Sequence, residues 1–236
     1  SVQMYLNIKA KIIYVAVLLF LVTSCAYFNT FYNAEKSFES ATDIINRKHL
    51  LEDDIPSSAK TFLDDAIENS AQVIQKFPNS KYIDHAYYII GVSLFLKGNY
   101  SSSINYITEI TKKFKGSEFY TEALLWSCYN YLRLEQNDLY NEIFNDIIRY
   151  ETLKNNEKYL YHNILAEKAL SDGDIDLVYS EYEKAIISTN TKSEKVNMYI
   201  KLIRLCLEKS IEDYDRVISY LEEIQLYMDD VIKRHD

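Results

Sequence analysis

The feature that most constrains this chain is a unit of two helical patterns that returns 37 residues further along the sequence. The first copy runs from Phe77 to Phe114 and has a turn near Gly98. The positions that correspond at this spacing are Phe77 with Phe114, Ser80 with Ser117, Tyr82 with Phe119, and Ala86 with Ala123. Repeat periods of 20–50 residues are typical of solenoids, in which each unit buries its apolar face only against its neighbours. The sequence therefore predicts an all-α solenoid and indicates a binding scaffold.

The unit also resembles the tetratricopeptide repeat. Gly91 leaves room for two helices to approach closely, and Gly98 can adopt the left-handed conformation that ends a helix. The residues that fill the family's pattern are Tyr87, Ile90, Gly91, Leu94, Gly98, Tyr100, Ser103, Ile107 and Ile110. The resemblance implies a right-handed α-solenoid of about five helix pairs.

Composition supports long helices and argues against two classes of partner. The chain of 236 residues has only 4 glycines and 2 prolines, which suits helices joined by short turns. Its net charge of −9 disfavours contact with phosphate backbones and anionic lipid head groups. We therefore expect no nucleic-acid partner, and membrane attachment only by means other than a basic surface.

The N-terminus offers such a means. Lys9 and Lys11 precede an apolar run, Ile12–Val22, which is too short to span a membrane but matches the core of a secretory signal peptide. The following Val22-Thr23-Ser24-Cys25 resembles the bacterial lipobox. This resemblance implies a lipoprotein signal peptide at residues 1–24 and acyl chains on Cys25, which anchor stably when two or more are present. The alternatives are an ordinary signal peptide, or a buried first helix with an incidental cysteine.

Residues 25–236 then form one tetratricopeptide-like helical repeat domain. We expect helix pairs at residues 29–47 with 58–76, 80–114, 117–150, 157–188 and 192–231, and a loop at 50–57. Ala166 takes the position of Gly91 in the fourth unit, whereas Leu205 departs from the small-residue pattern in the fifth. The third turn, Glu135–Asp138, lacks glycine and is expected to be one residue longer.

Residues for catalysis or metal binding do not gather in the sequence. The four histidines are scattered, and no glycine-rich phosphate loop is present. Asp172–Asp176 resembles part of a calcium loop, but a turn between two helices explains it better. Cys128 and Cys206 fall in different repeats and are expected to be buried free thiols. The sequence predicts no enzyme, no cofactor and no metal.

The predicted site is the concave groove, which the first helix of each pair lines in tetratricopeptide repeats. Its mixture of aromatic and charged residues suits capture of a peptide segment or a partner helix. The residues at the family's groove positions are His85, Tyr88, Val92, Phe95, Glu122, Leu125, Tyr129, Arg133, Asn163 and Glu167.

Repeats behind a lipid-attached cysteine resemble the BamD family of outer-membrane assembly lipoproteins, with Phe77–Tyr82 as the local match. The resemblance implies a periplasmic helper that holds a β-barrel assembly protein or its substrates. Because Ala26 follows the cysteine, where an aspartate favours the inner membrane in Gram-negative relatives, it implies the periplasmic face of the outer membrane. The alternative is a generic scaffold lipoprotein for cell-wall, secretion or motility complexes.

Overall fold

The computed structural model describes residues 28–46, 55–147, 152–208 and 214–232. The expected signal peptide at 1–24 and the lipidation site Cys25 lie outside these ranges, as does most of the expected loop at 50–57.

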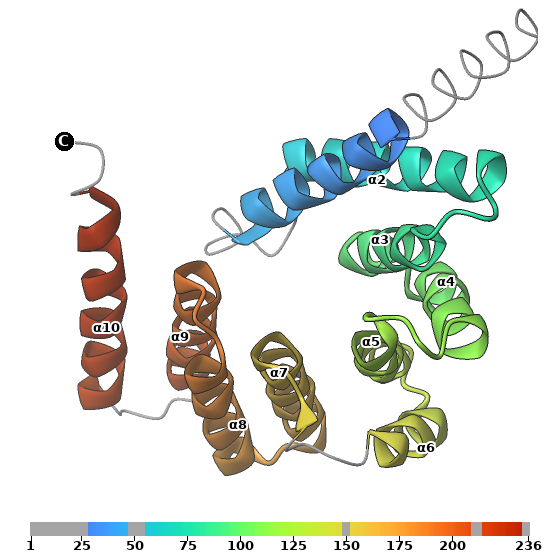
Figure 1. Cartoon of the computed structure of the whole chain (residues 1–236). Coiled ribbons are helices and arrows are strands. Elements are labelled where there is room, and N and C mark those ends of the chain that lie inside the picture. Colours follow the sequence, from blue (N-terminus) through green and yellow to red (C-terminus); the bar gives the residue numbers. More distant parts are fainter. Residues whose placement is uncertain (1–27, 47–54, 148–151, 209–213, 233–236) are drawn as a thin grey trace, which may run out of the picture.

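Every long element in the described ranges is an α-helix, and no strand occurs there. An N-terminal helix at residues 28–46 is followed by helices that are labelled in Figure 1. These are α2 (Ser57–Lys76), α3 (Ile83–Leu96), α4 (Tyr100–Lys113), α5 (Tyr120–Arg133), α6 (Asn137–Asp146), α7 (Asn155–Asp172), α8 (Ile175–Ser188), α9 (Lys192–Glu208) and α10 (Tyr214–Ile232). Figure 1 shows that they follow one another in an arc. The all-α helical-repeat solenoid that the sequence predicts is confirmed.

The junctions between units have the same backbone geometry at the 37-residue spacing. The backbone N–H of Ser80 donates to the carbonyl of Phe77 at 2.9 Å, and Ser117 does the same to Phe114 at 2.9 Å. Each serine hydroxyl then accepts a backbone N–H two residues later, at 3.0 Å for Ser80 and 3.1 Å for Ser117. The serine hydroxyl thus satisfies a donor that the start of the next helix leaves free, which explains why serine recurs here.

The turns inside the second and third units correct one expectation. The N–H of Asn99 donates to the carbonyl of Leu94, and the N–H of Gln136 donates to Tyr131, both at 2.9 Å. Gly98 has a φ of 78° and Glu135 a φ of 57°, so each residue supplies the left-handed step that ends its helix. The expectation of a longer third turn was wrong, because Glu135 adopts the conformation that was thought to need glycine.

Gly91 lies at a close contact between α3 and α4. A β-carbon on Gly91 would come within 2.4 Å of Cδ1 and 2.6 Å of Cγ1 of Ile107, a fully buried side chain. The hydroxyl of Ser103 donates to the carbonyl of Gly91 at 2.7 Å across the same contact. Only glycine allows this approach of the two helices.

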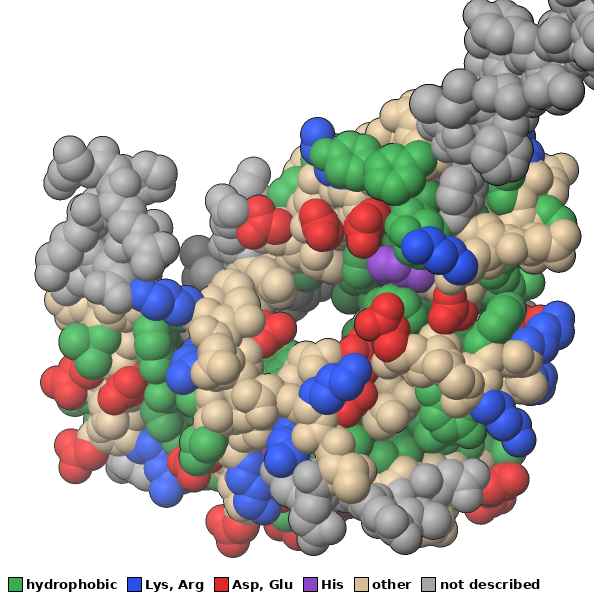
Figure 2. All heavy atoms as spheres, viewed as in Figure 1, with side chains coloured by type: hydrophobic (Ala, Val, Ile, Leu, Met, Phe, Trp, Pro, Cys, Tyr) green, Lys and Arg blue, Asp and Glu red, His purple; other side chains and the backbone are tan. Residues whose placement is uncertain are grey.

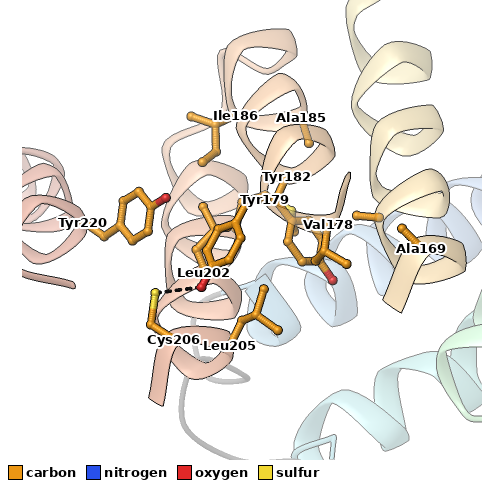
Figure 3. Packing of buried hydrophobic residues seen from close by; sticks show 12 residues of the cluster. Ala169, Val178, Tyr179, Tyr182, Ala185, Ile186, Leu202, Leu205, Cys206 and Tyr220 are labelled. Atoms are coloured by element: carbon orange, nitrogen blue, oxygen red, sulfur yellow. Dashed lines mark hydrogen bonds between the residues drawn. The ribbon is translucent and has the colours of Figure 1, made fainter. Parts of the chain in front are cut away.

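The C-terminal units share an apolar core between α7, α8, α9 and α10. Figure 3 shows Tyr179 and Tyr182 of α8 between Ala169 of α7 and the side chains of α9. The Sγ of Cys206 lies 3.1 Å from the hydroxyl of Tyr179. Cys128 and Cys206 are buried free thiols, as the sequence predicts.

Candidate functional site: the inner face of the solenoid

The inner face of the solenoid encloses a cavity of about 480 Å³. All of its lining residues come from the first helix of a pair, which is the side on which the repeat resemblance places the groove. The N-terminal helix contributes Ile45 and Asn46, and the remaining lining residues are Tyr88, Phe95 and Leu96 of α3, Glu122, Trp126 and Tyr129 of α5, Asn156, Tyr159, Leu160 and Asn163 of α7, and Glu194, Asn197, Met198, Ile200, Lys201 and Arg204 of α9. The volume is within the range of about 300–1,000 Å³ usual for ligand sites.

The cavity is enclosed because the arc brings α9 back to the N-terminal helix. The amide Nδ2 of Asn197 donates to Oδ1 of Asn46 at 3.4 Å, although 151 residues separate the two in sequence. Figure 2 shows the hollow as an opening in the middle of the face that it views. The inner face is therefore surrounded by the first helices instead of forming a shallow open groove.

Aromatic rings form the wall of the cavity on α3 and α5. The ring centroid of Phe95 lies 4.9 Å from that of Trp126 and 4.6 Å from that of Tyr129. Trp126 and Tyr129 are stacked at 6.0 Å. Rings at such separations pack favourably and hold one another in place. The wall is thus a rigid apolar surface.

Glu122 lies beside this wall. Its Oε2 accepts a hydrogen bond from the hydroxyl of Tyr88 at 2.5 Å, and its Oε1 accepts one from Nδ2 of Asn156 at 2.6 Å. The indole N–H of Trp126 donates to the hydroxyl of Tyr88 at 3.3 Å. Burial raises the pKa of Glu122, and burial together with the charge of Glu122 raises the pKa of Tyr88.

A second carboxylate, Glu167, has basic partners. It forms ion pairs with Arg133 at 3.2 Å and with Lys201 at 2.9 Å, and it accepts a hydrogen bond from Tyr182 at 3.2 Å. Burial by itself raises the pKa of Glu167, but the two cations outweigh it and leave the pKa lowered. Burial likewise opposes the charge of Lys201, yet Glu167 raises the pKa of Lys201 above its ordinary value.

The structure separates the ten groove residues predicted from the sequence into three groups. Tyr88, Phe95, Glu122, Tyr129 and Asn163 line the cavity. Arg133 and Glu167 belong to the adjoining ion-pair network, in which Lys201 also donates to Asn163 at 2.9 Å.

The other three predicted residues lie elsewhere. Val92 and Leu125 are buried in the core, and their side chains do not line the cavity. His85 lies between the rings of Phe31 and Phe119 at a separate cavity of about 620 Å³ near the N-terminal helix. Burial lowers the pKa of His85 below its ordinary value.

Sequence reasoning missed several residues of the cavity, above all those on α9. Glu194, Asn197, Lys201 and Arg204 recur at spacings of three and four residues, so they share one face of the helix. That periodicity was available in the sequence. Trp126 was missed because it comes one residue after Leu125, which occupies a groove position of the repeat family.

Two kinds of feature are absent from the described residues. No group of three histidine, cysteine, aspartate or glutamate side chains in these ranges is arranged to hold a metal ion. None of the described helices combines the length and the apolar character that crossing a bilayer requires.

No protein-family model matches the chain, and no curated protein matches it.

Proposed function

We propose that this chain is a protein-binding scaffold whose inner face holds a segment of a partner protein. The observation that carries the proposal is the cavity, which is lined by first helices from all parts of the solenoid. A partner that enters it contacts several repeats at once. The lining joins aromatic rings to amide and charged groups, a combination that suits both the backbone and the side chains of a peptide.

The same proposal places the scaffold at a membrane. It rests on the Val22-Thr23-Ser24-Cys25 sequence and on the position of the first described helical residue, Phe28, only three residues after Cys25. Such a short connection would hold the solenoid close to the lipid surface. Together with Ala26, this supports a lipid-anchored protein on the periplasmic face of the outer membrane.

The role that we assign to the scaffold is BamD-like assistance in outer-membrane protein assembly. Its support is the Phe77–Tyr82 junction, whose hydrogen bonds recur at residues 114–119. The alternative is a scaffold for a cell-wall, secretion or motility complex, and the partner recovered in the second experiment below decides between them.

Lipid anchoring can be tested by mass spectrometry of the protein purified from the membranes of its host. We expect a mature N-terminus at Cys25 that carries acyl chains, and release of the Cys25→Ser variant from the membrane fraction. A Cys128→Ser variant serves as the control and should remain attached. An unmodified Cys25 in the native protein would refute the anchor.

Partner capture can be tested with a photocrosslinking amino acid in the cavity. We expect a residue of this kind at Tyr159 or Asn163 to trap a partner protein in living cells. The control position is Tyr214, which is exposed on α10 and outside the cavity lining. Equal crosslinking at all three positions would contradict the proposal, a β-barrel protein would support the BamD-like role, and a cell-wall, secretion or motility protein would refute that role.

A further inference from the structure

Two of the carboxylates at the inner face, Glu122 and Glu167, differ in how their charge is balanced. Glu167 is paired with Arg133 and Lys201. Glu122 accepts hydrogen bonds from two neutral donors, Tyr88 and Asn156. In the part of the chain that the structure describes, no basic side chain forms an ion pair with Glu122, although Lys154 is near enough to favour its charged form.

A half-buried carboxylate without a cation is unfavourable, because hydrogen bonds replace only part of the solvation that burial removes. Glu122 nevertheless faces the cavity, where a ligand can reach it. A cation on that ligand could form the ion pair that no described basic side chain forms with Glu122. The position of Glu122 therefore constrains the chemistry of the occupant.

The rings around Glu122 favour the same chemistry. Tyr88 and Phe95 of α3 and Trp126 and Tyr129 of α5 all line the cavity, on the helices that hold Tyr88 and Glu122. The guanidinium carbon of Arg133 already lies 5.2 Å from the ring centroid of Tyr129. The face of an aromatic ring attracts an ammonium or guanidinium group within about 6 Å. The hydrogen bond from Trp126 to Tyr88 fixes two of these rings beside the carboxylate.

We propose that the cavity recognises a lysine or arginine side chain on the partner segment, with its cationic group against Glu122 and the aromatic wall. This inference rests on the proposed scaffold function and specifies what that scaffold selects. The net charge of −9 agrees with it, since an acidic protein attracts a cationic segment from a distance. Lys201 and Arg133 already balance the charge of Glu167. Of the two carboxylates that line the cavity, Glu122 and Glu194, we choose Glu122 because it lies beside the aromatic wall.

The single tryptophan of the chain provides a direct measurement, because Trp126 lines this cavity. We would titrate the full chain with an acetylated and amidated pentapeptide that has lysine at its centre, and follow Trp126 fluorescence. The matched probe carries norleucine, which keeps the aliphatic chain and lacks the charge. We expect the lysine peptide to bind about tenfold more tightly, with an advantage that shrinks at high salt. Equal binding of the two peptides would overturn the inference.

A variant locates the effect at one residue. Glu122→Gln keeps the size of the side chain and one acceptor oxygen but removes the negative charge. It should therefore reduce binding of the lysine peptide by about tenfold and leave the norleucine peptide unchanged. Glu222→Gln, on the exposed side of α10, is the matched control and should change neither. An unchanged preference for lysine in Glu122→Gln would place the cation elsewhere and refute the role of Glu122. Should Glu122→Gln fail to fold, the comparison of the two peptides on the native chain still decides.

The crosslinking experiment separates this inference from the function beneath it. A partner crosslinked through Tyr159 or Asn163 would support the scaffold function. If the two peptides nevertheless bind equally, cation recognition is refuted. Crosslinking that is no stronger in the cavity than at Tyr214 would refute the scaffold itself.

Discussion

The α3–α4 pair and the α9–α10 pair are two copies of the same kind of repeat, but their second helices are packed differently. On α4, Ser103, Ile107 and Ile110 are completely buried. On α10, Tyr220 is 7% exposed, whereas Ile218 is 52% exposed. Within the described residues, α4 packs between α3 and α5, whereas α10 packs against α9.

The residue at the small position of each first helix accounts for part of this difference. Gly91 lets α4 approach until Ile107 occupies the space of a missing β-carbon. Leu205 fills the same position on α9 and is itself part of the core with Tyr220. The same repeat position can therefore hold a glycine at a close approach of two helices in one unit and a large buried side chain in another. A smaller side chain should therefore destabilise the protein at Leu205, and a larger one should destabilise it at Gly91.

The largest expected effect is at Leu205. Leu205→Ala should lower the free energy of unfolding by about 2–5 kcal/mol, because it removes buried apolar contacts and leaves a cavity in the core of the C-terminal units. Leu207→Ala on the same helix is the control, since Leu207 is largely exposed, and it should cost less than about 0.5 kcal/mol. Chemical denaturation of both variants measures the difference, and similar losses would contradict the assigned packing of α9.

Enlarging Gly91 should cost less but act by the opposite mechanism. Gly91→Leu should overpack the contact with Ile107 and lower the free energy of unfolding by about 1–3 kcal/mol. The double variant Gly91→Ala with Ile107→Ala tests the cause, because alanine at position 107 lacks both the Cδ1 and the Cγ1 atoms that a β-carbon on residue 91 would meet. We expect the two changes together to cost less than the sum of their separate costs. Additive losses, or an unchanged melting curve for Gly91→Leu, would argue against the close approach.

The turns at Gly98 and Glu135 allow a paired test with opposite signs. Glu135→Gly should raise the free energy of unfolding by about 0.5–1 kcal/mol, since it relieves a left-handed residue that carries a side chain. Gly98→Ala introduces the same strain and should lower it by about 1 kcal/mol, with no steric clash because the space around Gly98 is open. Thermal melts of the two variants should move in opposite directions, and movement in the same direction would disprove the equivalence of the turns.

The smallest effect is expected on the exposed face of α10. Ile218→Lys should change the free energy of unfolding by less than about 0.5 kcal/mol, because the side chain buries little apolar surface. The same change at Ile107 should prevent stable folding, since an unpaired charge would be buried there. A loss above about 1 kcal/mol for Ile218→Lys would show that this face of α10 is covered.

Much of the fold could be predicted because its signals are local. Helix pairs follow from apolar residues at spacings of three and four, and the junctions follow from Phe77 and Ser80 with their counterparts 37 residues later. The third turn could not be predicted, since the left-handed conformation of Glu135 is imposed by helices on both sides and leaves no mark in the residue type.

The site was harder to predict than the fold. Family positions identified Tyr88, Glu122 and Tyr129 but also Val92 and Leu125, whose side chains turn into the core. Whether a residue on a first helix faces the cavity or the next helix depends on a small rotation of that helix. Repeat patterns alone do not specify such a rotation, because both faces are partly apolar.

The sequence by itself determined that this chain forms stacked helix pairs with small residues where helices meet, because each unit can bury its apolar face only against a neighbour. Only the tertiary structure decided that the arc returns Asn197 to Asn46 and encloses a cavity. The angle between successive units adds up over the whole array, so a contact between residues 151 positions apart is set by many small packing differences and not by any one motif. By contrast, Glu122 lies beside Tyr88 and Asn156 because neighbouring units pack together, since each of these partners is 34 residues away.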